Sequence, residues 1–315
     1  MTSKRTLNDS GFASTTPEPE VSVLLVTHNQ GGYVRQALDG VAMQQTSFEV
    51  EVVLADDYSQ DSTPEILREY EAGNPRARLL PTERRLGITR NYKRGFDACR
   101  GRYVAVLEGD DFWTSPRKLE LLAAFLRRHP ECSFCFHRII RLDEASGQAA
   151  VYPAFGAGAE PEFFTARRLA RGNFIGNFSA CVYRRDIIAD LGPGLWSMKV
   201  REWPFNIVVA RRGLIGYVPE IMSVYRAHPG GVWSQKAPAE QRAALSELIE
   251  TYNNYLEFEF DAEFQSVRDA LTAEARERGE ADGAGPAYRR LGRRMKSFVP
   301  PVLVSMMNGI KGRGR

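Results

Sequence analysis

Apolar segments of two kinds alternate along the first 130 residues, and this alternation restricts the fold more than any other feature of the chain. Short continuous apolar runs, which predict buried strands, lie at 21–27, 50–55, 77–81 and 102–108. Each run is followed by a segment with helical spacing or helix-start signals, at 31–45, 56–72, 89–99 and 115–129. This order predicts an α/β fold with a doubly wound, mostly parallel sheet and helices on both faces. In the second of these segments, Ser62 and Glu65 have the spacing of a capping box.

Polar side chains follow three of the predicted strands. They are Thr27, His28 and Asn29 after the first strand, Asp56 and Asp57 after the second, and Glu108, Asp110 and Asp111 after the fourth. Ligands of open parallel sheets bind at the carboxyl ends of the strands, so we expect these side chains to face one crevice. Carboxylates this close raise each other's pKa unless a cation or hydrogen-bond donors offset the repulsion. The cluster at 108–111 therefore predicts a bound partner.

Several protein classes are disfavoured by what the chain lacks. No G-x-G-x-x-G follows the first strand and there is no Walker loop, which argues against a dinucleotide-dependent dehydrogenase and a P-loop nucleotidase. The four cysteines are too irregular for a disulfide framework and no signal peptide precedes the first strand, so we expect a cytoplasmic protein. Cys132 and Cys135 form a C-x-x-C without a second pair, and the surrounding sequence favours a core strand over a zinc site.

The positive charge is concentrated at the C-terminus. The net charge is +3, yet residues 283–315 contain eight Lys and Arg residues and no Asp or Glu. The apolar stretch inside this segment, FVPPVLVSMM, is far shorter than the roughly 20 residues that a membrane-spanning helix needs. We therefore expect either peripheral attachment to the inner, anionic face of the membrane or a disordered or partner-binding tail. Residues 1–20 are polar and are expected to be disordered.

Four segments together resemble the family 2 inverting glycosyltransferases of the GT-A fold. They are VSVLLVTHN, EVVLADDYSQDST, LGITRNYKRGFDACRGRYVAVLEGDDFWTSPRKL and GYVPEIMSVYRAHPGGVWS, and the closest similarity is to the bacterial branch whose metal motif reads E-G-D-D-[YF]-W. The resemblance covers 21–234 and implies a GT-A domain with a nucleotide-binding half at 21–115 and an acceptor half at 116–234. A helical extension at 235–285 and a basic tail at 286–315 would follow.

The resemblance also implies roles for individual residues. The nucleotide sugar would be bound by Thr27, His28, Asn29, Asp56, Asp57, Arg90 and Asp110, and Mn²⁺ or Mg²⁺ would be held by Glu108, Asp111 and His228. Two positions depart from the family pattern: His28 stands where Tyr is more common, and Arg85 replaces the usual Asn before Gly87. A divalent cation held by carboxylates can neutralise the diphosphate leaving group, which would account for the acidic cluster.

The acceptor half would supply the catalytic base. The resemblance assigns this role to Glu202, one methylene longer than the Asp that is usual in this branch, and places Asn173, Asn177 and Trp203 on the acceptor side. The simpler interpretation of Glu202 is a helix-start carboxylate stabilised by the helix dipole. Beyond 234, two amphipathic helices are expected, with an apolar stripe suited to core packing or oligomer contact: Leu245, Leu248, Ile249, Tyr252 and Tyr255.

These expectations combine into one function. The chain is expected to be a metal-dependent inverting glycosyltransferase that moves a sugar from a nucleotide-diphosphate donor, UDP-linked by preference, to a hydroxyl of a growing glycan, free or lipid-linked. Such a reaction belongs to the synthesis of bacterial cell-surface polysaccharide, and no nucleic-acid partner is expected. Two alternatives stay open: a nucleotidyltransferase that makes sugar nucleotides, although its usual Gly-rich basic loop is missing after the first strand, and a non-catalytic sugar-nucleotide-binding module.

Overall fold

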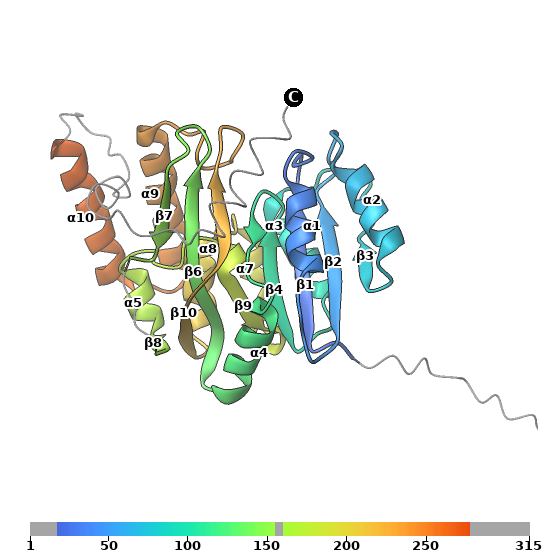
Figure 1. Ribbon diagram of the computed structural model, residues 1–315. Coiled ribbons are helices and arrows are strands. Elements are labelled where there is room, and N and C mark those ends of the chain that lie inside the picture. Colours follow the sequence, from blue (N-terminus) through green and yellow to red (C-terminus); the bar gives the residue numbers. More distant parts are fainter. Residues whose placement is uncertain (1–17, 155–159, 278–315) are drawn as a thin grey trace, which may run out of the picture.

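The computed structural model describes residues 18–154 and 160–277. The predictions for the basic tail at 286–315 and for nearly all of the N-terminal segment lie outside these residues. A ten-stranded sheet forms the centre of the fold (Figure 1), with strand order β3-β2-β1-β4-β9-β6-β10-β5, while β7 pairs with β6 and β8 with β10.

The strands are β1 (Val21–Thr27), β2 (Val50–Asp56), β3 (Ala77–Leu79), β4 (Tyr103–Glu108), β5 (Phe112–Trp113), β6 (Cys132–Asp143), β7 (Ala149–Tyr152), β8 (Glu162–Phe164), β9 (Cys181–Arg184) and β10 (Leu214–Ala227). The helices are α1 (Val34–Ala42), α2 (Thr63–Gly73), α3 (Ile88–Ala98), α4 (Lys118–Arg128), α5 (Ala166–Ala170), the one-turn helix η1 (Phe178–Ala180), α6 (Arg185–Ala189), α7 (Pro193–Ser197), α8 (Glu202–Ala210), α9 (Pro238–Tyr255) and α10 (Asp261–Glu277).

The first four predicted strands form the parallel part of the sheet, as expected. β1 lies between β2 and β4, and β3 flanks β2, all in parallel pairs. The second half is mixed, because β9 inserts antiparallel between β4 and β6, while β6 and β10 run parallel to each other. Both cysteines of the C-x-x-C are buried in β6, which confirms the core-strand interpretation.

Helices cover both faces of the sheet, and the buried strands divide their side chains between two cores. Val23 and Leu25 of β1 pack in one cluster with α1, α2 and α4, whereas Leu24 and Val26 pack in the other with α3, α5, α8 and α9. Successive strand residues point to opposite faces, so continuous apolar runs are what a sheet buried on both sides requires. The doubly wound architecture predicted from the sequence is confirmed.

The C-terminal helices belong to the second of these cores. Ile249 and Tyr252 of α9 are buried, and Leu245, Leu248 and Tyr255 pack beside them, so the predicted stripe is a core contact. Figure 1 shows α9 and α10 at the end of the molecule opposite β1, β2 and β3. Within the described residues, no helix has the length and apolar character needed to cross a membrane.

One local prediction is wrong. The side chain of Ser62 makes no capping hydrogen bond at the start of α2, and its backbone is already helical, with φ −71°. Asp61 takes that role, because its Oδ1 accepts the Thr63 N–H at 3.0 Å and its Oδ2 accepts the Gly31 N–H at 2.8 Å. The carboxylate thus ties the α2 start to the loop after β1.

Candidate functional site

The sheet register brings the three polar clusters to one edge. Thr27 lies opposite Asp56 in the β1–β2 pair, and Val26 lies opposite Glu108 in the β1–β4 pair. The carboxyl ends of β1, β2 and β4 therefore terminate side by side, as the strand-end residues predict. The residues after each strand form the floor of the candidate site.

Glu108 and Asp111 carry the strongest electrostatic perturbation in this cluster. Burial, with the neighbouring carboxylates of Asp110 and Glu202, raises the pKa of Glu108 to about 8, although Glu108 accepts a hydrogen bond from the Tyr92 hydroxyl at 2.9 Å. Burial and the charges of Asp110 and Glu108 also raise the pKa of Asp111 well above its usual value. Negative charge is therefore under-compensated here, which is the condition a bound cation would relieve.

Asp111 lies behind the surface of the site. It is fully buried, and its Oδ2 accepts hydrogen bonds from Asn177 Nδ2 at 2.5 Å and Ser179 Oγ at 2.6 Å. Its Oδ1 accepts the Arg226 N–H at 3.0 Å. Sequence reasoning placed Asp111 on the metal and Asn177 on the acceptor side, whereas the structure pairs these two side chains with each other inside the fold. Both oxygens of Asp111 are already engaged in holding η1 and β10 together.

Asp110 and His228 form the more open pair. Asp110 Oδ2 lies 3.2 Å from His228 Nε2, and the carboxylate is 22% exposed. Two ligands bound to one octahedral ion at about 2.1 Å lie about 3 Å apart, so this pair could share a divalent ion. The described residues contain no cluster of three His, Cys, Asp or Glu side chains arranged around one metal position. Nucleotide-site ions commonly take one or two protein ligands with phosphate oxygens and water, and the pair fits that pattern.

The sequence analysis missed Arg226, which links the acidic loop at 108–111 to Glu144 and Tyr33. Besides its N–H bond to Asp111, its Nη1 donates to the Asp110 carbonyl at 2.8 Å, and its Nε lies 3.2 Å from Glu144 Oε1. Its guanidinium lies over the ring of Tyr33, 5.2 Å from the centroid. The side chain is buried on β10, so this cation fixes the acidic loop and partly offsets its charge.

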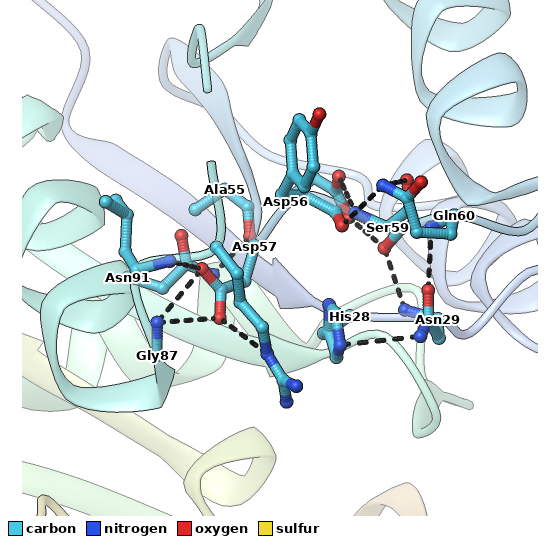
Figure 2. A network of polar contacts seen from close by, with 12 residues as sticks. His28, Asn29, Ala55, Asp56, Asp57, Ser59, Gln60, Gly87 and Asn91 are labelled. Atoms are coloured by element: carbon cyan, nitrogen blue, oxygen red, sulfur yellow. Dashed lines mark hydrogen bonds and ion pairs between the residues drawn. The ribbon is translucent and has the colours of Figure 1, made fainter. Parts of the chain in front are cut away.

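A second polar network holds the loops after β1 and β2 (Figure 2). Ser59 donates its backbone N–H to Asp56 Oδ2 at 2.9 Å and its hydroxyl to Asp56 Oδ1 at 2.5 Å. The same hydroxyl accepts the Asn29 N–H at 2.7 Å, and Asn29 Oδ1 accepts the Gln60 N–H at 2.8 Å. Beside them, the buried His28 Nδ1 has no hydrogen-bond partner among the described residues. Thr27, also buried, donates its hydroxyl to Gln30 Oε1 at 2.7 Å.

Asp57 fixes the loop before α3. Its Oδ1 accepts the Leu86 N–H at 2.6 Å, and its Oδ2 accepts the Gly87 N–H at 3.0 Å, as Figure 2 shows for Gly87. Gly87 has φ +84°, a conformation that favours glycine. Arg85, the departure from the family pattern, places its Nε 3.9 Å from Asp57 Oδ2. The loop therefore presents a cation beside the candidate nucleotide site.

Asn91 and Arg94, rather than Arg90, join α3 to this network. Asn91 is buried and donates to the Ala55 carbonyl at 2.8 Å, while its Oδ1 accepts Arg94 Nε at 2.8 Å. The side chain of Arg90, which the resemblance assigned to the nucleotide, is exposed and makes no hydrogen bond or ion pair within the described part of the chain. The helix position that faces the site is thus Asn91.

Replacing Asn91 by Leu should destabilise the protein by about 1–3 kcal/mol, because the buried Ala55 carbonyl would lose its donor. Urea unfolding of both proteins measures the change in unfolding free energy. Arg90→Leu is the matched control on the neighbouring exposed position and should change stability by no more than about 0.5 kcal/mol. Equal stability of the Asn91 variant and the parent would show that the hydrogen bond from Asn91 to the Ala55 carbonyl does not stabilise the fold.

Glu202 begins α8, and its charge acts on Glu108 of the acidic cluster. Its Oε2 accepts Asn173 Nδ2 at 2.7 Å and its Oε1 accepts Asn206 Nδ2 at 2.8 Å. Burial raises the pKa of Glu202 to about 7, although both amides favour the carboxylate. Glu108 and Glu202 lie near enough for the charge of Glu202 to raise the pKa of Glu108. A carboxyl group with this pKa is suited to proton transfer near neutral pH.

The predicted acceptor-side residues do not share one surface. Asn173 orients Glu202, whereas Trp203 is buried, donates its Nε1–H to the Leu169 carbonyl at 2.8 Å and packs edge-on against Phe264. Trp203 therefore joins α8 to α5 and α10 in the core. The amide of Asn206, which sequence reasoning missed, lies one helical turn after Glu202 and could have been found from that i, i+4 spacing.

Comparisons with known proteins agree with this fold. An uncharacterized protein of Mycobacterium tuberculosis is 38% identical over 219 residues, which are 68% of this chain and 60% of that relative. The chain thus spans less than two thirds of that relative's length. Among solved structures, S. aureus TarS with UDP-GlcNAc has a TM-score of 0.59 at 18% identity, covering 75% of this chain and 67% of that one.

A second solved structure is the mannosyltransferase PcManGT of Pyrobaculum calidifontis in complex with GDP-Man and Mn²⁺. Its TM-score is 0.52 at 15% identity, and the match covers 93% of this chain and 80% of that one. At these identities both structures establish the GT-A fold alone. The family model described as glycosyl transferase family 2 matches residues 22–192, more than half of the chain. On the strength of that match, with the fold and strand-end residues described above, the chain belongs to glycosyl transferase family 2.

Proposed function

We propose that this chain is a metal-dependent inverting glycosyltransferase that takes a sugar from a UDP-linked donor and transfers it to a hydroxyl of a growing glycan in cell-surface polysaccharide synthesis. The observation that carries the proposal is Glu202, a carboxyl group with a raised pKa that lies near enough to Glu108 for its charge to raise the pKa of that residue at the acidic strand end. A donor on the strand ends and a base facing it are the two parts that direct displacement requires.

The loops after β1 and β2 are suited to a nucleotide. The partly exposed imidazole ring of His28 offers a stacking face for the base. A carboxylate has about four acceptor positions, and the Leu86 and Gly87 amides occupy those of Asp57 only in part. The remaining position on Asp57 could accept the ring N–H of uracil, which supports a UDP donor over one whose base lacks an N–H at that edge.

Asp110 and His228 are the residues we assign to the divalent ion. Mg²⁺ takes oxygen ligands by preference, so a site that includes an imidazole nitrogen favours Mn²⁺. A bound ion of this kind supplies positive charge that stabilises the departing nucleoside diphosphate. Glu108 and Asp111 complete the acidic surroundings, with Asp111 behind the pair as the anchor of the loop.

Glu202 is assigned the proton transfer. In its deprotonated form, one oxygen of Glu202 takes the proton of the acceptor hydroxyl while the hydroxyl oxygen bonds to the anomeric carbon. The bond between that carbon and the diphosphate oxygen breaks at the same time, and the nucleoside diphosphate leaves. The hydrogen bonds from Asn173 and Asn206 restrict the rotation of the carboxylate and hold its acceptor lone pairs in place. Direct displacement with a single base inverts the configuration at the anomeric carbon and needs no covalent intermediate.

A panel of nucleotide sugars tests this proposal. Thermal unfolding with Mn²⁺ should show the largest stabilisation for UDP-linked donors, about 2.7 kcal/mol at a concentration 100 times the dissociation constant. Release of UDP from the stabilising donor then distinguishes an enzyme from a binding module. Release of inorganic pyrophosphate from a nucleoside triphosphate and a sugar phosphate would instead identify a nucleotidyltransferase. No stabilisation by any nucleotide sugar would contradict the proposal.

The basic tail is proposed to attach the enzyme to an anionic membrane, where a lipid-linked acceptor would be presented. Each basic residue near such a surface contributes about 1 kcal/mol, so the eight charges between 283 and 315 suffice for salt-sensitive binding. The full chain should float with vesicles that contain phosphatidylserine, and a chain ending at residue 285 should not. Equal flotation of both proteins would contradict this attachment.

A further inference from the structure

Lys118 is a charged residue in an unfavourable position. It is the first residue of α4, and its side chain is fully buried. A cation at a helix N-terminus opposes the helix dipole, and burial of an ammonium group is costly unless hydrogen bonds satisfy it. Burial lowers the pKa of Lys118 to about 7. Because the helix dipole and burial both disfavour the ammonium group, other contacts of Lys118 must offset these two costs.

The contacts of Lys118 form a continuous series of hydrogen bonds. Its Nζ lies 2.7 Å from His137 Nε2 and donates to the Ser179 carbonyl at 2.6 Å. His137 Nδ1 lies 2.6 Å from the Arg138 carbonyl, which can only accept, so Nδ1 carries the ring proton and Nε2 accepts from Lys118. The Nζ also lies over the Trp113 ring, 4.6 Å from its centroid. His137 thus fixes the direction in which the ammonium group points.

This series of hydrogen bonds ends on Ser179, the residue that orients the acidic loop at 108–111. Ser179 lies in η1, and its carbonyl accepts both the Lys118 ammonium and the Trp113 indole N–H, the latter at 3.2 Å. Its hydroxyl donates to Asp111 Oδ2 at 2.6 Å and accepts the Glu108 backbone N–H at 3.0 Å. The same residue is therefore held on one side by Lys118 and holds the acidic loop on the other.

We propose that Lys118 is a positioning residue for divalent-ion binding, and that it acts by fixing η1 behind the carboxylates. This inference rests on the proposed function, since it requires that the loop at 108–111 bind an ion with the nucleotide. Asp110, the assigned ligand, lies between Glu108 and Asp111 in the chain, so Ser179 bonds to the loop on both sides of the ligand. Lys118 touches neither substrate nor ion, and its effect passes through the position of the loop.

The test is a calorimetric titration of the full chain with Mn²⁺ at saturating UDP. Lys118→Met keeps an unbranched side chain one atom shorter but removes its donors, and it should raise the Mn²⁺ concentration for half-maximal binding about 10- to 100-fold. At saturating Mn²⁺, UDP affinity should return to the parent value. The control Phe125→Leu also removes buried volume from α4, and it should lower the melting temperature without changing the Mn²⁺ titration.

A second pair of variants decides the question if Lys118→Met does not fold. His137→Gln retains an oxygen that can accept from Lys118, whereas His137→Leu retains none. The Leu variant should weaken Mn²⁺ binding as Lys118→Met does, and the Gln variant should restore it. Unchanged Mn²⁺ titrations in the folded variants would overturn the inference while leaving the proposed function standing. No Mn²⁺ binding by the parent chain with UDP would overturn both.

Discussion

Glu202→Gln is expected to lower kcat about 10²- to 10⁴-fold, the usual contribution of a general base. The amide retains the size of the side chain, and its oxygen can still accept from one of the two amides of Asn173 and Asn206, but it cannot take the acceptor proton. UDP affinity with Mn²⁺ should stay unchanged, because the donor lies on the strand ends instead. Steady-state kinetics, with the nucleotide sugar identified by thermal unfolding, measures kcat. A UDP titration in Mn²⁺ measures the UDP affinity.

The pH dependence gives this prediction a second readout. Burial raises the pKa of Glu202 to about 7, and the base must be deprotonated to act, so kcat of the parent should fall as pH drops below about 7. This fall should be absent in the residual activity of Glu202→Gln. Glu131→Gln, at an exposed carboxylate before β6, is the control and should keep the parent profile. If Glu202→Gln retains more than about a tenth of the parent kcat, the base lies elsewhere.

Asp110→Asn is expected to remove Mn²⁺-dependent donor binding and to lower kcat/KM about 10²- to 10³-fold. A metal ion contributes several kcal/mol to stabilising the leaving group, and each 1.36 kcal/mol corresponds to a factor of ten. The substitution preserves the shape of the side chain but removes its charge, which leaves His228 as the remaining metal ligand of the pair. Calorimetric titration of UDP with and without Mn²⁺ measures the first effect, and initial rates measure the second.

The neighbouring carboxylate is the matched comparison. Asp111 accepts three hydrogen bonds from η1 and β10, so Asp111→Asn should lower the melting temperature as well as ion binding. Asp110→Asn should leave the melting temperature of the metal-free protein near that of the parent, since the Asp110 carboxylate is partly exposed. The assignment of the ion to Asp110 would fail if Asp111→Asn alone abolished Mn²⁺ binding with no loss of stability.

The sequence predicted the parts of the site that local patterns determine. Alternating strands and helices specify a parallel sheet, and the parallel register alone brings Thr27, Asp56 and Glu108 to one edge. Residues at the carboxyl ends of strands could therefore be found without coordinates. The two-sided burial of β1 also follows from its unbroken apolar run.

The contacts that join distant segments could not be predicted in this way. Asp111 is held by Ser179 and Arg226, which lie 68 and 115 residues away, and no periodicity in the sequence reports such pairs. Lys118 lies at the start of an amphipathic helix, where a lysine is normally solvated, and only tertiary packing buries it. Trp203 is the opposite case, because an aromatic residue beside a candidate base can equally be a core residue, and here its indole N–H donates to the Leu169 carbonyl.

The central claim is that the strand-end edge binds a uridine nucleotide through a divalent ion. Calorimetric titration of the full chain with UDP, in Mn²⁺ and again in excess EDTA, tests it most directly. We predict a single-site binding curve in Mn²⁺ and no measurable binding in EDTA, with the Mn²⁺ curve retained in Glu202→Gln. Equal UDP affinity in Mn²⁺ and in EDTA, or no binding in either, would contradict the claim.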